Sequence, residues 1–413
     1  MPQSSNPAGT KVRLDSIDAL RGIAALMVAG YHIWGHYGIY PFPSLGVVPY
    51  TSDAGFFAYL VSPLRWGYLG VSLFLVLSGF CIHLPFARRK QSGEQYDFNA
   101  RAFYLRRLWR LYPAYAVSVI GTFLLLTLLY PTTSTEVPSH NLGDLLSHLT
   151  LTQGYFDRYF YSIVNVYWSL ALEFQLYLLY PIFLYSFYKL GATRAVAVLT
   201  VVALAWRIVS LDVFHYQLIS ISWTGPYAMM GSVLARMPEW LFGAWLAEWY
   251  VHGGHQKARR MSLAFISALI LLLAILSSLD QRLWSLTDIL FGLGFAYLIG
   301  ASITPRKAVI ASKEPTRTSW LATNFYRRLV WIGTISYSLY LFHAQLSWIA
   351  NPWIRTLPGT ILPFALRTVV LILSIPVIAF IYRFVEAPFL KAPRLGERFH
   401  KLYARLEHQV EAG

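Results

Sequence analysis

The sequence has few charged residues and a single cysteine, and each scarcity excludes whole classes of protein. Asp, Glu, Lys and Arg make up 13% of the 413 residues, against about 25% in soluble domains. So few charges cannot cover the surface of a soluble enzyme of this size, and the 56% of apolar residues excludes a disordered chain. Cys81 alone excludes a disulfide framework and a cysteine-based zinc site.

Acidic residues are scarcer than basic ones, 19 against 34, which gives a formal net charge of +15. On a soluble domain such a charge would indicate nucleic-acid binding. In so apolar a chain it indicates Lys and Arg gathered on one side of a bilayer. We therefore expect a lipid bilayer as a partner and no nucleic acid.

Long apolar runs are abundant. Runs of about 20 residues can cross about 30 Å of hydrocarbon as helices. We predict ten spans: 19–40, 67–87, 112–130, 165–188, 195–211, 227–251, 261–279, 283–303, 329–350 and 361–384. The predicted fold is an all-α, multi-pass membrane helical bundle with a membrane domain over 19–390, flanked by cytoplasmic tails over 1–18 and 391–413.

The distribution of basic residues sets the predicted orientation of these spans. If the N-terminus is cytoplasmic, 27 of the 34 lysines and arginines fall in the inner segments. Cytoplasmic loops of membrane proteins carry such an excess, and a wrong span count would scramble the alternation. We therefore place both termini inside.

Ionisable side chains within the predicted spans are costly, and each is a candidate site residue. Arg21 lies at the inner mouth of the first span, and His32 lies eleven residues on, about 16 Å deeper. Glu173 and His343 lie inside the fourth and ninth spans. A histidine in a span can equally be a helix-to-helix hydrogen-bond partner, and Glu173 can be structural.

An arginine cluster precedes the third span in the segment RAFYLRRLWRLYP. If this segment is helical, Arg107 and Arg110 share a face. Guanidinium groups match phosphate oxygens in bidentate geometry, so the pair is a candidate phosphate clamp. The alternative is a positive-inside signal or anionic-lipid binding.

Other polar residues receive simpler interpretations. Arg236 and Glu239, three residues apart, are expected to form a local ion pair. Histidines near span ends or in loops, such as His83 and His148, are expected to contact water. The sequence offers no ligand pattern for a metal.

Six segments carry a family resemblance. In chain order they are LDSIDALRGIAALMVAGYH, GVSLFLVLSGF, FYLRRLWRLYP, WSLALEFQLYLLYP, ISYSLYLFH and YRFVEAPFL, and they are spread over residues 13–390. With these segments the chain resembles the integral-membrane acyltransferase 3 family, whose members O-acylate sugars, lipopolysaccharide, peptidoglycan and some antibiotics. Each segment alone is weak, but six in family order form a specific signal.

The resemblance implies roles for the residues at matching positions. Arg21 and His32 match the family's Arg-x10-His pair and are expected to be catalytic. Arg107 and Arg110 match its Arg-x-x-Arg and are expected, with the adjacent Arg106, to bind the acyl donor.

Two further motifs complete the predicted site. Glu173 stands in the WSL…E motif, where Phe174 replaces a second acidic residue often seen in the family, so Glu173 is the one carboxylate of that motif. The closing motifs supply supporting residues, namely Ser336, Tyr337, His343 and Glu386.

The resemblance also implies the donor. The family usually draws on acetyl-CoA or another acyl-CoA from the cytoplasm, so we expect acyl-CoA as a substrate, acetyl by default, and no permanently bound cofactor. Neutral imidazole titrates near pH 6.5, close to the working pH. We hypothesise that His32 is the general base, with Glu173 orienting it; the alternative is that His32 is transiently acylated and relays the group.

The acceptor implied by the family is a hydroxyl of a cell-surface, exported or lipid-linked glycan, with a macrolide-type molecule as the alternative. The expected location is the cytoplasmic membrane of a bacterium. Because no hydrolase-like domain follows the last span, the resemblance implies that the chain completes transfer itself or uses a separate periplasmic partner. A secondary transporter of a glycan, lipid or acyl group is the rival interpretation, and the Arg-x-x-Arg cluster argues against it.

Overall fold

The computed structural model describes residues 15–35, 61–93, 98–129, 140–212, 217–219, 222–224, 227–305, 317–354, 356–359 and 361–390. The predicted C-terminal tail and residues 1–14 of the predicted N-terminal tail lie outside this part of the chain. The described residues are mostly helical, as predicted from the apolar runs.

The long helices are α1 (Asp15–Gly35), α3 (Gly70–Gln91), α4 (Ala100–Leu129), α7 (Trp168–Leu190), α8 (Ala192–Asp212), α10 (Val233–Val251), α12 (Arg260–Ser278), α13 (Trp284–Ile303), α14 (Arg317–Thr334), α15 (Ser336–Ile354) and α16 (Ile361–Ile381). The short helices are η2 (Ser62–Leu69), α5 (Leu142–Leu149), η3 (Gln153–Tyr155), α6 (Asp157–Phe160), α9 (Tyr227–Met230), α11 (Gly254–Lys257), η4 (Gln281–Leu283), the π-helical η5 (Tyr382–Glu386) and α17 (Ala387–Leu390). Two short strands, β1 (Gln217–Ile219) and β2 (Ser222–Thr224), form a small antiparallel sheet.

Seven helices in the described part of the chain are long and apolar enough to cross a membrane. They cover Pro63–Gln91, Ala100–Leu128, Trp168–Leu190, Ala192–Leu211, Arg260–Ser278, Trp284–Ile303 and Ile361–Leu390. This agrees with a helical membrane protein. The other three predicted spans correspond to α1, α10 and α15, so the count of ten stays a prediction.

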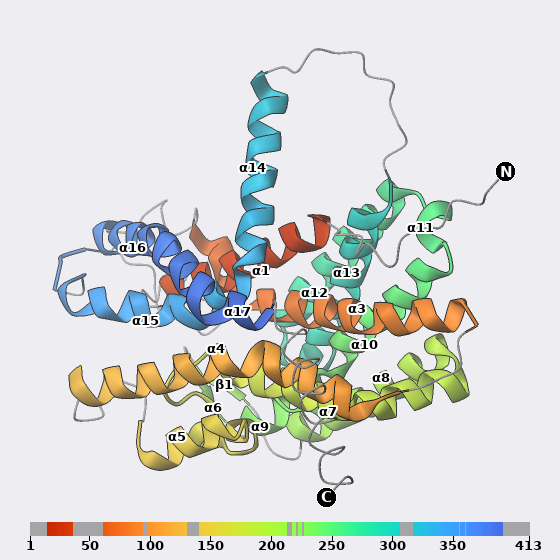
Figure 1. Cartoon of the computed structure of the whole chain (residues 1–413), viewed down its shortest axis with the longest axis horizontal. Coiled ribbons are helices and arrows are strands. Elements are labelled where there is room, and N and C mark those ends of the chain that lie inside the picture. Colours follow the sequence, from red (N-terminus) through yellow and green to blue (C-terminus); the bar gives the residue numbers. More distant parts are fainter. Residues whose placement is uncertain are drawn as a thin grey trace, which may run out of the picture.

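The ninth predicted span, 329–350, is wrong at its start. The chain turns between α14 and α15, and α14 runs crosswise to α15 and projects from the bundle (Figure 1). The last turns of α14 pack on α1, where a Cβ at Gly333 would lie 1.8 Å from the Asp18 carbonyl oxygen. The apolar residues before Gly333 therefore cover α1 instead of extending α15, and an apolar run alone does not show this change of direction.

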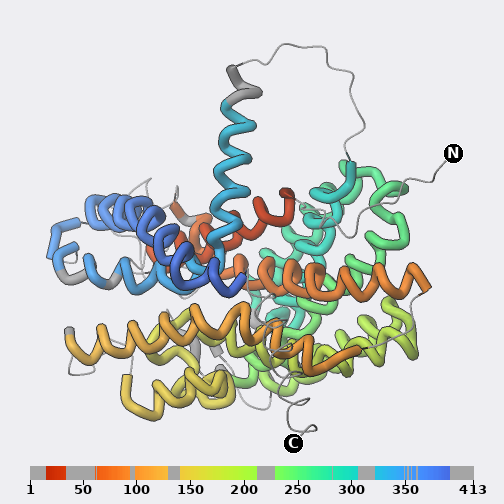
Figure 2. The backbone as a smooth tube through the Cα atoms, viewed as in Figure 1, coloured from red at the N-terminus to blue at the C-terminus, as the bar shows by residue number. Residues whose placement is uncertain are grey.

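Helices α3 and α10 form the closest pair in the core. A Cβ at Gly79 would lie 1.9 Å from the Trp240 carbonyl oxygen, and one at Gly243 would lie 2.0 Å from that of Val76. Only glycine permits this backbone contact. Helix α3 also packs on α1, and α1 packs in turn on α15. Figure 2 shows α1, in red, near the middle of the molecule.

A buried ion network joins α8, α10 and α13. Arg236 contacts Glu239 at 2.7 Å, as the sequence predicted, and also Asp288 at 3.1 Å. Asp288 contacts Arg207 at 2.8 Å, and Arg207 donates to the carbonyl oxygens of Trp284 and Ser285. Each charge in this network is paired, as buried charges require.

Two histidines expected to contact water are instead buried. His83 lies 3.1 Å from both the Glu248 carboxylate and the Tyr180 hydroxyl. His148 on α5 donates from Nδ1 to the Asp144 carbonyl oxygen at 2.8 Å, and burial lowers its pKa to about 4. The prediction for His83 failed because its partners lie on α7 and α10. The prediction for His148 failed because the expected loop folds into α5, which carries both His148 and Asp144.

Candidate active site

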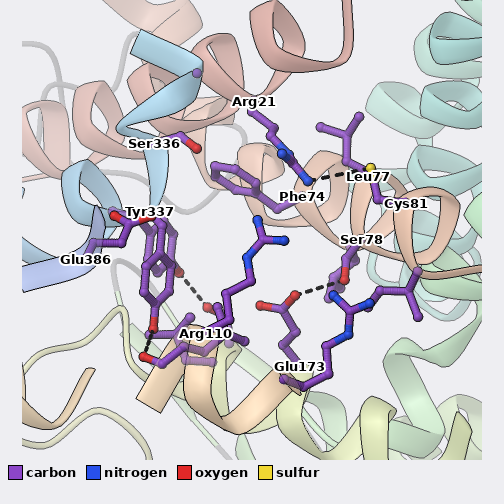
Figure 3. Close-up of a pocket in the computed structure, with 18 of the residues that line it drawn as sticks. Arg21, Phe74, Leu77, Ser78, Cys81, Arg110, Glu173, Ser336, Tyr337 and Glu386 are labelled. Atoms are coloured by element: carbon purple, nitrogen blue, oxygen red, sulfur yellow. Dashed lines mark hydrogen bonds between the residues drawn. The ribbon is translucent and has the colours of Figure 1, made fainter. Parts of the chain in front are cut away.

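A cavity of about 300 Å³ lies among α1, α3, α4, α7, α15 and η5. Its charged lining residues are Asp18, Arg21, Arg107, Arg110, Glu173 and Glu386. Figure 3 shows Arg21 and Arg110 entering this space from opposite sides, with Glu173 and Glu386 at its edges. The structure therefore brings together charged residues that are up to 368 positions apart in the sequence.

Arg21 enters the cavity from α1, one turn after Asp18. Its guanidinium lies 3.6 Å from the Asp18 carboxylate and 3.5 Å from the sulfur of Cys81. Helix α14 packs directly on the α1 backbone where Gly333 meets Asp18, so α14 holds in place the part of α1 that carries Arg21. Gly333 and Thr334 themselves line the cavity.

Arg107 and Arg110 enter the cavity from α4, on the face predicted from their spacing. Among the described residues, neither forms an ion pair or hydrogen bond with a protein carboxylate, and the Nε of Arg107 is buried without a hydrogen-bond partner. Arg107 lies over the Phe103 ring, 5.5 Å from its centroid. Arg106 is absent from the cavity lining, so nothing in the structure groups it with the other two.

The nearby carboxylates are held by neutral donors. Glu173 accepts hydrogen bonds from Ser78, at 2.8 Å, and from Tyr177. Glu386 accepts from the backbone N–H of Ser338 at 3.1 Å and from its hydroxyl at 2.6 Å. These bonds leave the positive charges of Arg107 and Arg110 available to an anion.

The π-helix η5 is what aims Glu386 at α15. Single π-helical turns often occur at functional sites, because the extra residue changes where a side chain points. Ser336 and Tyr337, at the start of α15, line the same cavity. Tyr337 donates to the Leu111 carbonyl oxygen at 2.8 Å and so ties α15 to α4. Its supporting role in the site stays a prediction.

His32 and His343 form a pair of their own. His343 Nε2 lies 3.0 Å from His32 Nδ1, and neither residue lines the cavity. Tyr340, which does line it, lies between the two regions, with its ring centroid 6.3 Å from that of His343. His343 is thus one partner of His32, whereas the hydrogen bonds of Glu173 come from Ser78 and Tyr177. The hypothesis that Glu173 orients His32 stays a prediction.

The backbone around His343 determines which ring nitrogens carry hydrogen. His343 Nδ1 lies 3.0 Å from the carbonyl oxygens of Leu339 and Tyr340, which only accept, so Nδ1 is the protonated nitrogen. In neutral His343, Nε2 then accepts, and His32 Nδ1 is the donor. The lone pair of His32 is therefore on Nε2.

Similarity to known proteins extends over most of the chain. A family model described as an acyltransferase domain, that of acyltransferase 3, matches residues 14–383. The chain belongs to this family. No solved structure is similar to the chain at a significant level.

The chain is similar to several proteins whose names describe them as acetyltransferases. Peptidoglycan O-acetyltransferase OatA of Listeria monocytogenes is 24% identical over 91% of this chain and 56% of its own length. A Staphylococcus aureus protein, provisionally named an O-acetyltransferase, is 27% identical over 79% of this chain and 53% of its own length. A provisionally named acetyltransferase of Acidianus two-tailed virus is 24% identical over 79% of this chain and 81% of its own length. The chain spans about half the length of the two bacterial relatives.

The acyltransferase 3 motifs did not indicate every residue of the cavity. Phe74, Cys81, Ser169 and Tyr340 also line it. All four lie within or beside the matching segments, but their side chains are of types that commonly pack in a membrane core. Among the described residues, no cluster of three or more His, Cys, Asp or Glu side chains is placed to hold a metal ion.

Proposed function

We propose that this protein is a membrane O-acyltransferase that moves an acyl group, acetyl by default, from acyl-CoA to a hydroxyl of an exported or cell-surface glycan. The observation that carries the proposal is the pair Arg107 and Arg110. In a chain of the acyltransferase 3 family, both guanidinium groups face a cavity whose carboxylates Glu173 and Glu386 are already hydrogen-bonded to hydroxyls.

The donor binds at this cavity. Arg107 and Arg110 hold phosphate oxygens of the CoA moiety, since charge-assisted bonds from guanidinium to phosphate are strong and directional. The pantetheine arm enters the cavity, and the acyl end lies against Tyr340 and Ser169. Arg21 is held by Asp18 at the same cavity, and its N–H groups are available to the oxygen of the thioester carbonyl.

His32 acts as the general base. Its Nε2 carries the lone pair because its Nδ1–H donates a hydrogen bond to Nε2 of His343. Nε2 takes the proton of the acceptor hydroxyl as the hydroxyl oxygen attacks the thioester carbonyl carbon. The carbon–sulfur bond then breaks, and the thiolate of CoA leaves and receives the proton from His32. His343 is a positioning residue in this scheme.

The proposal includes a cellular setting, which the helical membrane fold and the family support. Ten spans with both termini cytoplasmic place the arginines on the side that holds acyl-CoA. The membrane is the cytoplasmic membrane of a bacterium, and the acceptor is a glycan or lipid-linked glycan, with a macrolide-type molecule as the alternative. The name of the Listeria relative supports peptidoglycan as the first acceptor to test. A separate periplasmic partner could complete the transfer.

The experiment is the release of free CoA thiol by purified protein supplied with acetyl-CoA and peptidoglycan fragments. We expect acceptor-dependent release. The double variant Arg107→Gln with Arg110→Gln should raise the KM for acetyl-CoA by about 10- to 150-fold, from roughly 1.5–3 kcal/mol for lost charged hydrogen bonds.

The matched control is Arg106→Gln, on the same helix but outside the cavity, which should leave the KM near the wild-type value. An equal effect of the Arg106 variant would show that general surface charge, not the cavity, attracts the donor. Transport of the glycan without any release of thiol would instead support a transporter.

A further inference from the structure

An aromatic pair lines the cavity beside the two histidines. Phe74 from α3 and Tyr340 from α15 both line the cavity, and their rings meet edge to face with centroids 5.8 Å apart. The Tyr340 ring also contacts the His343 ring, with centroids 6.3 Å apart. Tyr340 therefore borders both the cavity that the arginines enter and the histidine pair.

The two rings are held differently. The Tyr340 hydroxyl lies 2.5 Å from the Ser169 hydroxyl and donates to the Val166 carbonyl oxygen at 3.0 Å. These bonds anchor Tyr340 to the start of α7. Phe74 has no polar atom on its side chain, so packing alone positions its ring. Figure 3 shows Phe74 reaching into the space that Arg21 and Arg110 also enter.

We propose that the Phe74 ring limits the length of the acyl chain that the cavity accepts. The Tyr340 ring, which is held by its hydrogen bonds, packs against the Phe74 ring and keeps it in place. This inference rests on the proposed binding of acyl-CoA in the cavity. Arg107 and Arg110 hold the phosphates, so the acyl group reaches a defined depth, and the Phe74 ring takes up part of the space that the acyl group enters. A two-carbon group fits in front of the ring, and longer chains meet it.

Removing the ring should change selectivity in a calculable way. Each methylene that passes from water into an apolar pocket improves binding about fourfold. Butyryl carries two methylenes more than acetyl. In Phe74→Ala, the affinity ratio of butyryl-CoA to acetyl-CoA should therefore rise about 15-fold over the wild-type ratio, with the acetyl-CoA affinity itself little changed.

The test is direct binding of acetyl-CoA and butyryl-CoA to the full-length protein in lipid nanodiscs, by titration calorimetry without an acceptor. Phe74→Leu keeps an apolar side chain at this place in case the alanine variant does not fold, and it should give an intermediate ratio. Phe86→Ala is the control, because Phe86 is half-buried on the same helix, packs on Phe98 and Tyr180, and does not line the cavity.

The outcomes separate the two claims. A raised ratio in both Phe74 variants and an unchanged ratio in Phe86→Ala support the inference. Acetyl-CoA binding with the wild-type ratio in both Phe74 variants overturns it and leaves the proposed function standing. Absence of binding of either acyl-CoA to the wild-type protein overturns the proposed function and this inference with it.

Discussion

The pair of His32 and His343 allows a test that distinguishes positioning from donor binding. In His343→Leu, the side chain keeps its apolar bulk but loses the nitrogen that accepts from His32 Nδ1 at 3.0 Å. The Nδ1–H of His32 then loses its hydrogen bond to residue 343. Without that bond, the tautomer of His32 that has its lone pair on Nε2 is less stable. His32 is half-buried, and the loss of this hydrogen bond costs about 1–3 kcal/mol.

That cost converts to a loss of roughly 5- to 150-fold in kcat. The KM for acetyl-CoA should not change, because His343 does not line the cavity. In His343→Gln the side-chain oxygen can still accept from His32 Nδ1, so most of the loss should be restored. The assay is the rate of CoA thiol release at saturating acetyl-CoA, with acceptor present.

The decisive comparison is between the two variants. A large loss in His343→Leu, with most of it restored in His343→Gln, supports positioning through the hydrogen bond. Equal rates in the leucine variant and the wild type would refute the reasoning. A changed KM with an unchanged kcat would place His343 in donor binding and refute it as well.

Two further predictions concern other histidines. His32→Ala should abolish thiol release while acetyl-CoA still binds, as measured by titration; full activity in that variant would exclude His32 as the base. His148 is held neutral, with its pKa lowered from 6.5 to about 4, so its contribution to stability is present above pH 6.5 and is lost as pH falls from 6.5 to 4. At about 1.4 kcal/mol per pKa unit the loss is at most about 3 kcal/mol, and thermal unfolding at pH 7 and pH 5 should differ less in His148→Gln than in the wild type.

Much of the cavity could be predicted from the sequence. Arg21, Arg107, Arg110 and Glu173 are charged residues at or inside apolar spans, where only a site or a partner explains their cost. Arg107 and Arg110 are three residues apart in the sequence, so helix spacing already places them on one face. The structure brings all four to one cavity.

The histidine pair could not be predicted in the same way. His32 and His343 are 311 residues apart, and their helices are apolar on every face, so hydrophobic periodicity does not indicate which faces meet. The same limit explains the burial of His83, whose partner Glu248 is 165 residues away. Contacts of this kind depend on how the helices pack, which the sequence pattern does not specify.

The turn between α14 and α15 was missed for another reason. The apolar run continues through Ile335, and neither proline nor a charge marks the change of direction. Gly333 was the available signal, because a glycine late in a helix can permit close backbone packing. Its contact with Asp18 shows that it serves this purpose.

The most direct test of the account is an experimental structure of the protein with a non-hydrolysable acetyl-CoA analogue. We predict that the analogue's phosphates lie beside Arg107 and Arg110 and that its acetyl end lies in the cavity against Phe74 and Tyr340. An analogue bound elsewhere, with Arg107 and Arg110 still facing an empty cavity, would contradict the account.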